Sequence, residues 1–157
     1  MPKSLLKYKN YDVHSITTMC EGNYNANIAT WVMQTAMGGK TLCVALYKVD
    51  YTIELVRGSN ILNINLLHIG QTSLINKLGR RSGKENNKFK NLKFEFDNRG
   101  CPYLTEAIGY IQCKVLHSTD AGDHEIFICE VQKQVVLNPE KEVMTNNFLR
   151  EKGLVRG

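Results

Sequence analysis

Two neighbouring segments decide the fold: Ile108-Gly109-Tyr110-Ile111-Gln112-Cys113-Lys114-Val115-Leu116 and His124-Glu125-Ile126-Phe127-Ile128-Cys129-Glu130-Val131-Gln132-Lys133-Gln134-Val135-Val136. Polar and apolar residues partly alternate in both segments, which is the period of a strand with one buried face. The short stretch Thr119-Asp120-Ala121-Gly122 between them has the composition of a hairpin turn. Together the two segments predict a long antiparallel pair.

Five more segments are rich in β-branched and aromatic residues, as strands are. They cover residues 13–20, 27–37, 41–48, 60–66 and 92–96. Seven strands favour a closed barrel, because closure removes the unpaired edges that so many strands would otherwise expose. We therefore predict a small, mainly β, antiparallel barrel.

Helical patterns are few and short. They cover residues 50–57, 71–78 and 145–152, and each is followed by a glycine, namely Gly58, Gly79 and Gly153. Glycine commonly follows the last helical residue because it adopts the left-handed conformation without steric cost. We expect these helices to end at the glycines and to pack on the outside of the barrel.

The composition indicates one globular domain over residues 1–157. Of its residues, 43% are hydrophobic and 22% are charged, and no apolar run approaches the roughly 20 residues of a membrane span. The N-terminus has no apolar core or small-residue cleavage site of a signal peptide. We expect a cytoplasmic protein with no membrane partner.

The cysteines do not indicate a metal site. Their number is odd, they are widely spaced, and they include no Cys-x-x-Cys pair or Cys/His cluster. They are Cys20, Cys43, Cys101, Cys113 and Cys129. We predict that they are reduced and mostly buried, and that no metal is bound.

The charge points to an anionic ligand. The net charge is +5, and the densest basic stretch is Arg80-Arg81-Ser82-Gly83-Lys84, continued by Lys88, Lys90 and Lys93. Nucleic-acid binding would favour cations along one helix or exposed aromatic residues between them, whereas these cations occupy one loop. A phosphate of a small cofactor fits this loop better than a polymer, and a solvated surface loop is the alternative.

Two further segments are candidates for ligand binding. Residues 27–34 combine a strand-like core with small and hydroxylated side chains that a flat ligand could approach, although Trp31 taken locally is typical of a core anchor. Lys48 and Thr52 flank the start of the first short helix, where a phosphate dianion can bind. A capping role for Thr52 is favoured by the local sequence.

The histidines differ in their settings. His14, His68 and His117 have no liganding partner at metal spacing, and we interpret them as structural or surface residues. His124 opens a strand directly after Gly122-Asp123, where its side chain can project over a barrel mouth and donate a hydrogen bond to a substrate. On local grounds alone, Asp123 and His124 would simply stabilise the turn.

The order of these segments resembles the flavin reductase-like, FMN-binding split-barrel family over nearly the whole chain, from about Tyr11 to Gly157. The segments that carry the resemblance are residues 27–34, Val44-Ala45-Leu46, residues 62–67, Ser82-Gly83 with Lys88-Phe89, Cys101-Pro102-Tyr103-Leu104, residues 107–113 and Gly122-Asp123-His124. The resemblance implies an antiparallel, Greek-key-like split β-barrel with a few short helices outside.

The family resemblance also implies a site. It implies a homodimer with FMN, or alternatively FAD, near the subunit interface, and NADH or NADPH whose nicotinamide stacks on the flavin and transfers a hydride to flavin N5. Cofactor-binding roles fall by resemblance on Asn27, Ala29, Thr30, Trp31, Val32, Lys48, Thr52, Asn65, Leu66, Ser82, Lys84 and Lys88. Nicotinamide binding falls on Gly122, Asp123 and His124, with His124 as the catalytic-site residue. The cofactor supplies the chemistry, so no acid–base triad is required.

Departures from the family pattern leave a second function open. Many relatives have a Pro-Pro pair where this chain has Gly38-Gly39, and an acidic residue where it has Asn87. Relatives often have serines where Val49, Asp50 and Tyr51 stand. The alternative is an FMN-carrying electron-transfer module that takes electrons from a protein partner and passes them to a protein acceptor.

Overall fold

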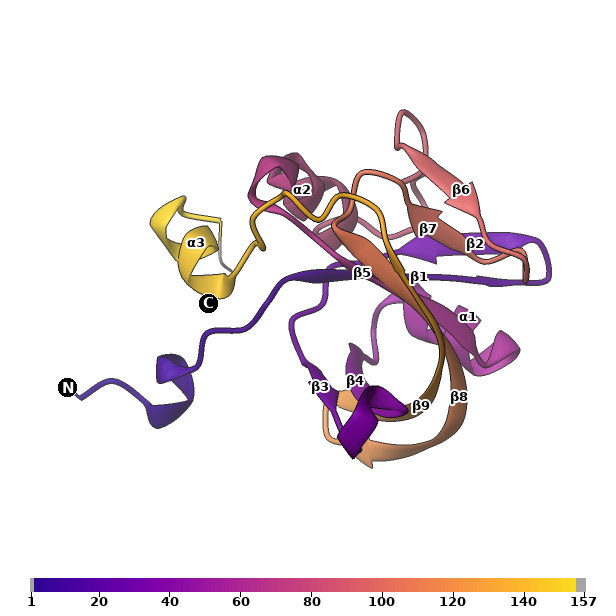
Figure 1. Ribbon diagram of the computed structural model, residues 1–157, viewed down its shortest axis with the longest axis horizontal. Helices are drawn as coiled ribbons and strands as arrows, with labels where there is room; N and C mark the ends of the chain where they lie inside the picture. Colours follow the sequence, from indigo (N-terminus) through magenta and orange to yellow (C-terminus); the bar gives the residue numbers. More distant parts are fainter. Residues whose placement is uncertain (1, 155–157) are drawn as a thin grey trace.

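The computed structural model describes residues 2–154. Its strands are β1 (His14–Cys20), β2 (Asn23–Ala26), β3 (Val32–Gln34), β4 (Thr41–Tyr47), β5 (Ile61–Leu66), β6 (Phe94–Phe96), β7 (Pro102–Leu104), β8 (Gly109–Ala121) and β9 (His124–Val136). Its helices are α1 (Tyr51–Ser59), α2 (Ser73–Gly79) and α3 (Asn146–Glu151), with 3-10 turns η1 (Leu5–Tyr8), η2 (Met37–Gly39) and η3 (Ile69–Gln71). The fold is mainly β, as predicted (Figure 1).

Seven strands form one antiparallel sheet in the order β2-β1-β5-β8-β9-β4-β3. The segment that links β2 to β3 brings the two ends of this sheet together. His14 and Ala29 exchange two backbone hydrogen bonds of 2.8 Å, and the Ala45 N–H donates to the Trp31 carbonyl at 3.0 Å. Residues 29–31 thus connect β1 to β4, and the sheet curls into a barrel.

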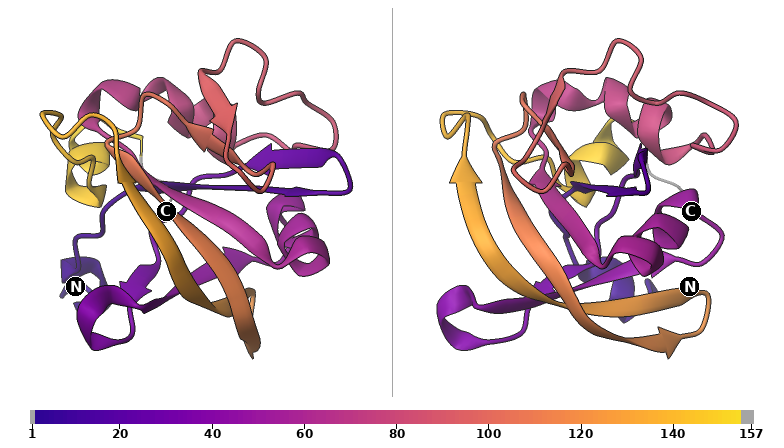
Figure 2. Two further views of the ribbon diagram at one scale, coloured as in Figure 1. Left: turned by 45° about the vertical axis from the view of Figure 1, so that its right-hand side comes forward. Right: turned by 90° about the vertical axis from the view of Figure 1, so that its right-hand side faces the viewer.

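The long hairpin predicted from the sequence is present, with a tighter turn than expected. β8 continues through Thr119, Asp120 and Ala121, so only Gly122 and Asp123 connect it to β9. Gly122 has a φ of +84°, which glycine adopts without strain. The pairing shifts register at Gln112/Cys113 and at Val115/His117. Such irregularities bend a strand pair, and Figure 2 shows both strands strongly curved.

One strand prediction was wrong in extent. Of residues 27–37 only Val32–Gln34 form a strand. The backbone of the preceding residues instead forms hydrogen bonds that connect β1 to β4. β2 and β7 were not predicted from the sequence. β2 contains two asparagines and β7 begins with a proline, both of which are depleted in strands.

α2 ends at Gly79 as predicted, whereas α1 extends past Gly58. α1 runs through Gly58 and is ended by Asn60, whose φ is +59°. A Cβ on Gly58 would lie 2.6 Å from the Cys20 sulfur, and a Cβ on Gly79, inside α2, would lie 3.1 Å from Ile28. These glycines allow close packing against β1 and the β2–β3 link. Gly153 follows α3 with a φ of +69°, as predicted.

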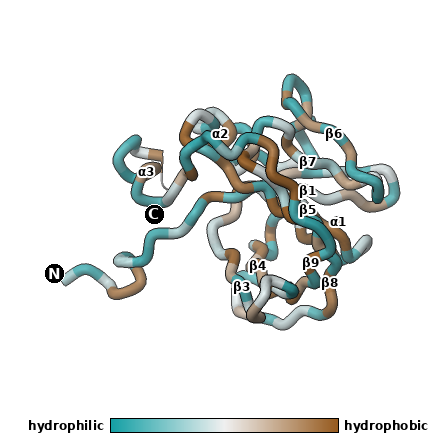
Figure 3. Tube along the Cα trace, viewed as in Figure 1, coloured by the Kyte–Doolittle hydropathy of each residue, from teal (hydrophilic) through white to brown (hydrophobic). Residues whose placement is uncertain are grey.

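Two apolar clusters stabilise the fold. One fills the barrel, and its buried members are Ile16, Ala29, Leu42, Val44, Leu46, Ile53, Val56, Leu62, Ile64, Cys113, Phe127 and Cys129. The other lies between β1, β7, α2 and α3, and includes Val13, Leu67, Leu78, Leu104, Met144 and Leu149. Figure 3 shows hydrophobic stretches of the chain, in brown, along the strands of the barrel. None of the helices within residues 2–154 has the length and apolar character needed to cross a bilayer.

The cysteines are placed as the sequence predicted. Cys101, Cys113 and Cys129 are buried, Cys20 and Cys43 are half-buried, and all five thiols are free. Contact with Cys129 and burial raise the pKa of the Cys113 thiol. That thiol is therefore neutral and acts as a small apolar side chain in the barrel.

A polar layer holds β7 against the sheet. The Thr17 hydroxyl and the Asn63 amide both donate to the Pro102 carbonyl, and the Asn65 side-chain oxygen accepts from the Leu104 N–H at 2.8 Å. All three side chains are buried. They replace the backbone ladder that β7 does not form with β1 or β5.

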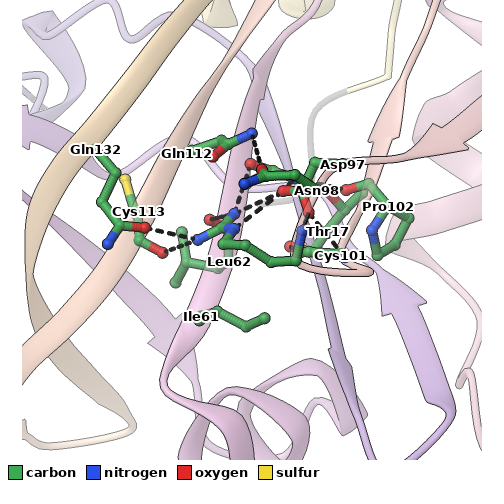
Figure 4. Close-up of polar contacts among 12 residues, drawn as sticks. Thr17, Ile61, Leu62, Asp97, Asn98, Cys101, Pro102, Gln112, Cys113 and Gln132 are labelled. Atoms are coloured by element: carbon green, nitrogen blue, oxygen red, sulfur yellow. Dashed lines mark hydrogen bonds and ion pairs between the residues drawn. The ribbon is translucent and has the colours of Figure 1, made fainter.

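Arg99, in the turn between β6 and β7, completes this attachment, and Figure 4 labels its partners Leu62, Asp97 and Cys113. Its guanidinium donates to the Cys113 carbonyl at 2.8 Å and to the Leu62 carbonyl at 3.2 Å. It also forms an ion pair of 2.9 Å with Asp97, whose side chain is only 1% exposed. Asp97 in turn accepts from the Asn63 amide at 3.0 Å. One charged pair therefore joins the β6–β7 turn to β5 and β8.

Candidate functional site

The side chain that opens β9 lies between two aromatic rings. His124 packs 5.1 Å from the Tyr47 ring, nearly parallel to it, and 4.8 Å from the Trp31 ring. We refer to Trp31, Tyr47 and His124 as the aromatic corner. Its tryptophan is 50% exposed, so the local interpretation of Trp31 as a core anchor was wrong. The Trp31 backbone is hydrogen-bonded to β4 where the barrel closes, and its ring lies on the surface.

The hairpin turn fixes the direction of the His124 ring. His124 Nδ1 lies 2.7 Å from a carboxylate oxygen of Asp123, and the Asp123 carbonyl accepts from the Lys48 N–H at 3.0 Å. When Nδ1 carries the proton, it donates a hydrogen bond to the carboxylate, and Nε2 is left for another partner. No other hydrogen bond to this ring is formed by residues 2–154. The contact with Asp123 therefore stabilises the turn and leaves Nε2 without a hydrogen bond to residues 2–154.

Two ion pairs lie next to the corner in sequence, and one of them joins β9 to α1. The Lys48 ammonium donates to Asp120, and this hydrogen bond lowers the pKa of the Asp120 carboxyl. Arg57, on α1, pairs with Glu125 of β9 at 2.6 Å. The fold thus brings together five of the residues singled out from the sequence, which are Trp31, Lys48, Gly122, Asp123 and His124.

A second group surrounds the start of α1. Thr52 is fully buried and its hydroxyl accepts from the Asn25 amide at 3.0 Å. The helix begins after Asp50, so the capping interpretation of Thr52 was wrong. Gly83 lies directly over Asn25, because a Cβ there would stand 2.1 Å from the Asn25 side-chain oxygen. Asn25 was not singled out from the sequence, since only the tertiary contact with Gly83 and Thr52 distinguishes it from other strand asparagines.

The loop at 82–84 lies close to this helix start. Lys84 pairs with Glu54 at 2.9 Å, and its ammonium lies 5.6 Å from the centre of the Tyr51 ring. The Ser82 hydroxyl accepts from the Lys84 N–H. Ser82, Lys84 and Thr52, predicted to bind one cofactor, therefore lie together around the first turn of α1.

Other predicted cofactor residues are engaged within the fold. The Asn27 side chain accepts from the Ile16 N–H, and Asn65 contacts both β1 and β7. The buried Lys88 ammonium donates to the carbonyls of Ala26 and Leu78 at 2.9 and 2.7 Å. Burial lowers the pKa of Lys88. Cofactor contacts by these side chains remain predictions.

The remaining predicted cofactor residues lie along the barrel closure. Ala29 pairs with His14, Val32 pairs with Val44, and Leu66 pairs with His14 on its other side. Thr30 lies between Ala29 and Trp31 and is half-buried.

The other histidines stand apart from the corner, as predicted. The His68 ring accepts from the Gly70 N–H and caps η3. His117 is exposed on β8. His14 is on β1, and its Nδ1 is buried.

The fold and these groups define a class: a small antiparallel barrel with an outward-facing aromatic corner and a cationic loop over the start of its first helix. The chain matches the family described as "Flavin reductase like domain" over residues 10–150. The protein belongs to this flavin reductase-like family.

Known proteins similar to the chain include two with functional names. It is 30% identical over 129 residues to the high molecular weight rubredoxin of Moorella thermoacetica, covering 81% of this chain and 56% of that protein. It is 26% identical over 146 residues to the ferric-chelate reductase (NAD(P)H) of Archaeoglobus fulgidus, covering 91% of this chain and 86% of that protein. The chain thus spans little more than half of the first relative and most of the second.

A solved structure has the same fold. Component B of nitrilotriacetate monooxygenase from Mycobacterium thermoresistibile superposes with a TM-score of 0.80 at 22% sequence identity. The match covers 90% of this chain and 78% of that one. At this identity the likeness establishes the architecture, including the barrel predicted from the sequence.

Proposed function

We propose that the protein is an NAD(P)H-dependent flavin reductase that binds FMN, with FAD as the alternative flavin. The observation that carries the proposal is the aromatic corner, where Asp123 orients His124 beside the exposed ring of Trp31. Family membership and the name of the Archaeoglobus fulgidus relative support it. Purified protein mixed with FMN and NADH or NADPH tests it. Oxidation of the nicotinamide above the rate with free flavin supports the proposal, and a rate equal to that background contradicts it.

The residues present fit a flavin nucleotide. The 82–84 loop packs so tightly on Asn25 that only glycine fits at position 83, which holds Ser82 and Lys84 at the start of α1 as donors to a phosphate. The exposed Trp31 ring and the small residues before it suit a flat ring system. A bound flavin would supply the redox step, with its N5 receiving a hydride from the nicotinamide. The protein's own contribution is binding, orientation and exclusion of water.

His124 is proposed to bind the nicotinamide through Nε2, which has no hydrogen bond to residues 2–154. We expect His124→Ala to raise the KM for NADH or NADPH about tenfold, because it removes one hydrogen bond and a packing surface. FMN affinity should stay within about twofold. Steady-state kinetics and flavin titration measure the two effects. His117→Ala, an exposed histidine on the neighbouring strand, is the control, and an unchanged KM in His124→Ala would remove this residue from the site.

Lys48 is proposed to interact with the flavin phosphate by exchanging Asp120 for it. We expect Lys48→Ala to weaken FMN binding about tenfold, because a charge-assisted hydrogen bond is lost. Riboflavin, which lacks the phosphate, should bind almost unchanged. Fluorescence titration of apoprotein with both flavins measures the difference.

The ion pair itself provides the matched control for Lys48. Asp120→Asn breaks the same contact but retains the ammonium, so FMN binding should be unchanged or tighter. Equal losses of affinity for FMN and for riboflavin in Lys48→Ala would place Lys48 away from the phosphate. If Asp120→Asn lowered the affinity for FMN as much as Lys48→Ala does, the effect would be assigned to the ion pair.

We also propose a homodimer. The aromatic corner is continuous in sequence with exposed apolar residues, including Met33, Met37 at 96% exposure and Val49 at 75% exposure. Monomeric soluble proteins rarely expose large apolar patches, and such patches often mark an interface with a partner. Light scattering should give about twice the 17.8 kDa chain mass. A monomer at micromolar concentration would contradict the proposal.

The five free thiols support a reducing compartment, and we place the protein in the cytoplasm.

A second function is favoured by one of the relatives. The Moorella thermoacetica protein is named as a rubredoxin and is longer than the region matched by this chain. A flavin-carrying module that exchanges electrons with protein partners would retain FMN and yet oxidise no nicotinamide above the free-flavin background. The activity assay with FMN therefore separates the two functions.

A further inference from the structure

A basic cleft lies between α2 and the loop that follows it, apart from the aromatic corner. Its volume is about 270 Å³, and its lining residues are Lys77, Arg81, Asn86, Asn87, Lys88, Lys90 and Asn91. The lining combines four cationic and three amide side chains. No carboxylate from residues 2–154 lines it.

Only part of the basic stretch noted in the sequence lines this cleft. Lys84 turns away and pairs with Glu54 at the start of α1. The Lys88 ammonium is directed inward to two backbone carbonyls, and the Lys77 ammonium donates to the Lys90 carbonyl. These contacts fix the cleft without neutralising its charge.

Two cationic groups of the cleft are available to a ligand. The Arg81 guanidinium and the Lys90 ammonium form no hydrogen bond or ion pair with other groups of residues 2–154. Both residues are exposed. A concave surface lined by one sign of charge concentrates the field and attracts counter-ions. Guanidinium and ammonium groups together suit a phosphate, which accepts several charge-assisted hydrogen bonds at once.

We propose that this cleft binds a phosphate group, as a second anion site separate from the start of α1. The lining has no aromatic ring, whereas sites for single-stranded nucleic acid stack bases on aromatic side chains. Its size suits one phosphate or diphosphate group with bound water. The phosphate can come from a dinucleotide cofactor or be free in solution. The inference does not depend on flavin reductase activity.

The decisive experiment titrates the flavin-free full chain with inorganic phosphate and with pyrophosphate at low ionic strength, by calorimetry. Wild-type protein is compared with Arg81→Met/Lys90→Met. The matched control is Lys114→Met/Lys133→Met, which removes the same two positive charges from exposed positions on β8 and β9. Both double variants change the net charge from +5 to +3.

We expect saturable binding that weakens at least about tenfold in the cleft variant and less than about twofold in the control. All four substituted side chains are exposed, so unchanged urea midpoints would verify that each variant is folded. Equal affinities in the two double variants, or no saturable binding to wild type, would overturn the proposal.

The source of the phosphate is resolved by the same variants. Loss of FAD affinity with FMN affinity retained would assign the diphosphate of FAD to the cleft. A higher KM for NADPH with that for NADH unchanged would assign the 2′-phosphate. If neither changes while phosphate binding is lost, the cleft binds the free anion. The phosphate titration needs no flavin or nicotinamide, so its failure is distinct from failure of the reductase proposal.

Discussion

Replacing Arg99 with methionine is expected to lower the free energy of unfolding by about 3–5 kcal/mol, because it leaves the buried Asp97 carboxylate without its counter-ion. The side chain of Asp97 is 1% exposed and that of Arg99 is 15% exposed, so water can replace little of the lost interaction. The carbonyls of Leu62 and Cys113 also lose donors. The loss should appear as a lower urea midpoint and, for a domain of this size, as a melting temperature about 10 °C lower.

The ion pair predicts non-additivity as well. Asp97→Asn removes the charge that Arg99 neutralises, so the double variant Asp97→Asn/Arg99→Met should lose less stability than the sum of the two single losses. Arg150→Met, at an exposed position of α3, is the control and should lose less than about 0.5 kcal/mol. A loss below about 1 kcal/mol in Arg99→Met would show that the β6–β7 turn is not held by this pair.

Acid should weaken the same contact. Burial favours the neutral form of Asp97, but hydrogen bonds from Arg99 and Asn63 outweigh it and hold the pKa of this carboxyl below its ordinary value. Because the native pKa is below the unfolded one, the stabilisation is complete above about pH 4 and is lost as pH falls through the native pKa.

The outline of the barrel was predictable because alternation and β-branched residues report local strand formation. The β8–β9 hairpin and β1 follow that pattern closely. The two short strands β2 and β7 do not, because side chains rather than a regular apolar pattern hold them. Thr17, Asn63 and Asn65 attach β7, and no local pattern shows that three separate polar residues face one strand.

The candidate site was predictable in part. The turn before His124 is encoded by Gly122-Asp123, so its position at the hairpin followed from the sequence. The exposure of Trp31 and the burial of Lys88 did not, since both depend on how distant strands meet. A lone tryptophan is more often buried and a lysine more often exposed, and the closure of the barrel reverses both tendencies here.

The second large effect is expected in mild acid and arises from His14. Its Nδ1 is buried without a hydrogen-bond partner among residues 2–154. Burial lowers the pKa of His14 to about 4, although the neighbouring Asp12 acts in the opposite direction. In the unfolded chain the pKa of histidine is about 6.5. Between these values the unfolded state binds a proton that the native state does not, so stability falls as pH decreases from about 6.5 to about 4.

The size and place of this loss connect it to the candidate site. A difference of this size between the two pKa values corresponds to about 3 kcal/mol, complete near pH 4 and absent above about pH 7. His14 forms the backbone pair with Ala29 that closes the barrel, and residues 29–32 are among the predicted cofactor-binding residues. Acid should therefore weaken both the barrel closure at His14 and Ala29 and the binding of the flavin.

Unfolding in urea at pH 7, 6, 5 and 4 measures the effect, with His14→Gln and His117→Gln compared with the wild type. His14→Gln removes the titrating group, so its stability should change little across this range, while wild type and the exposed His117→Gln should both decline. Flavin fluorescence followed through the same titration should show release in the wild type at a higher pH than in His14→Gln. Parallel declines in all three proteins would mean that His14 takes up its proton as readily in the native state as in the unfolded chain, and the barrel closure would then not be the acid-sensitive part of the fold.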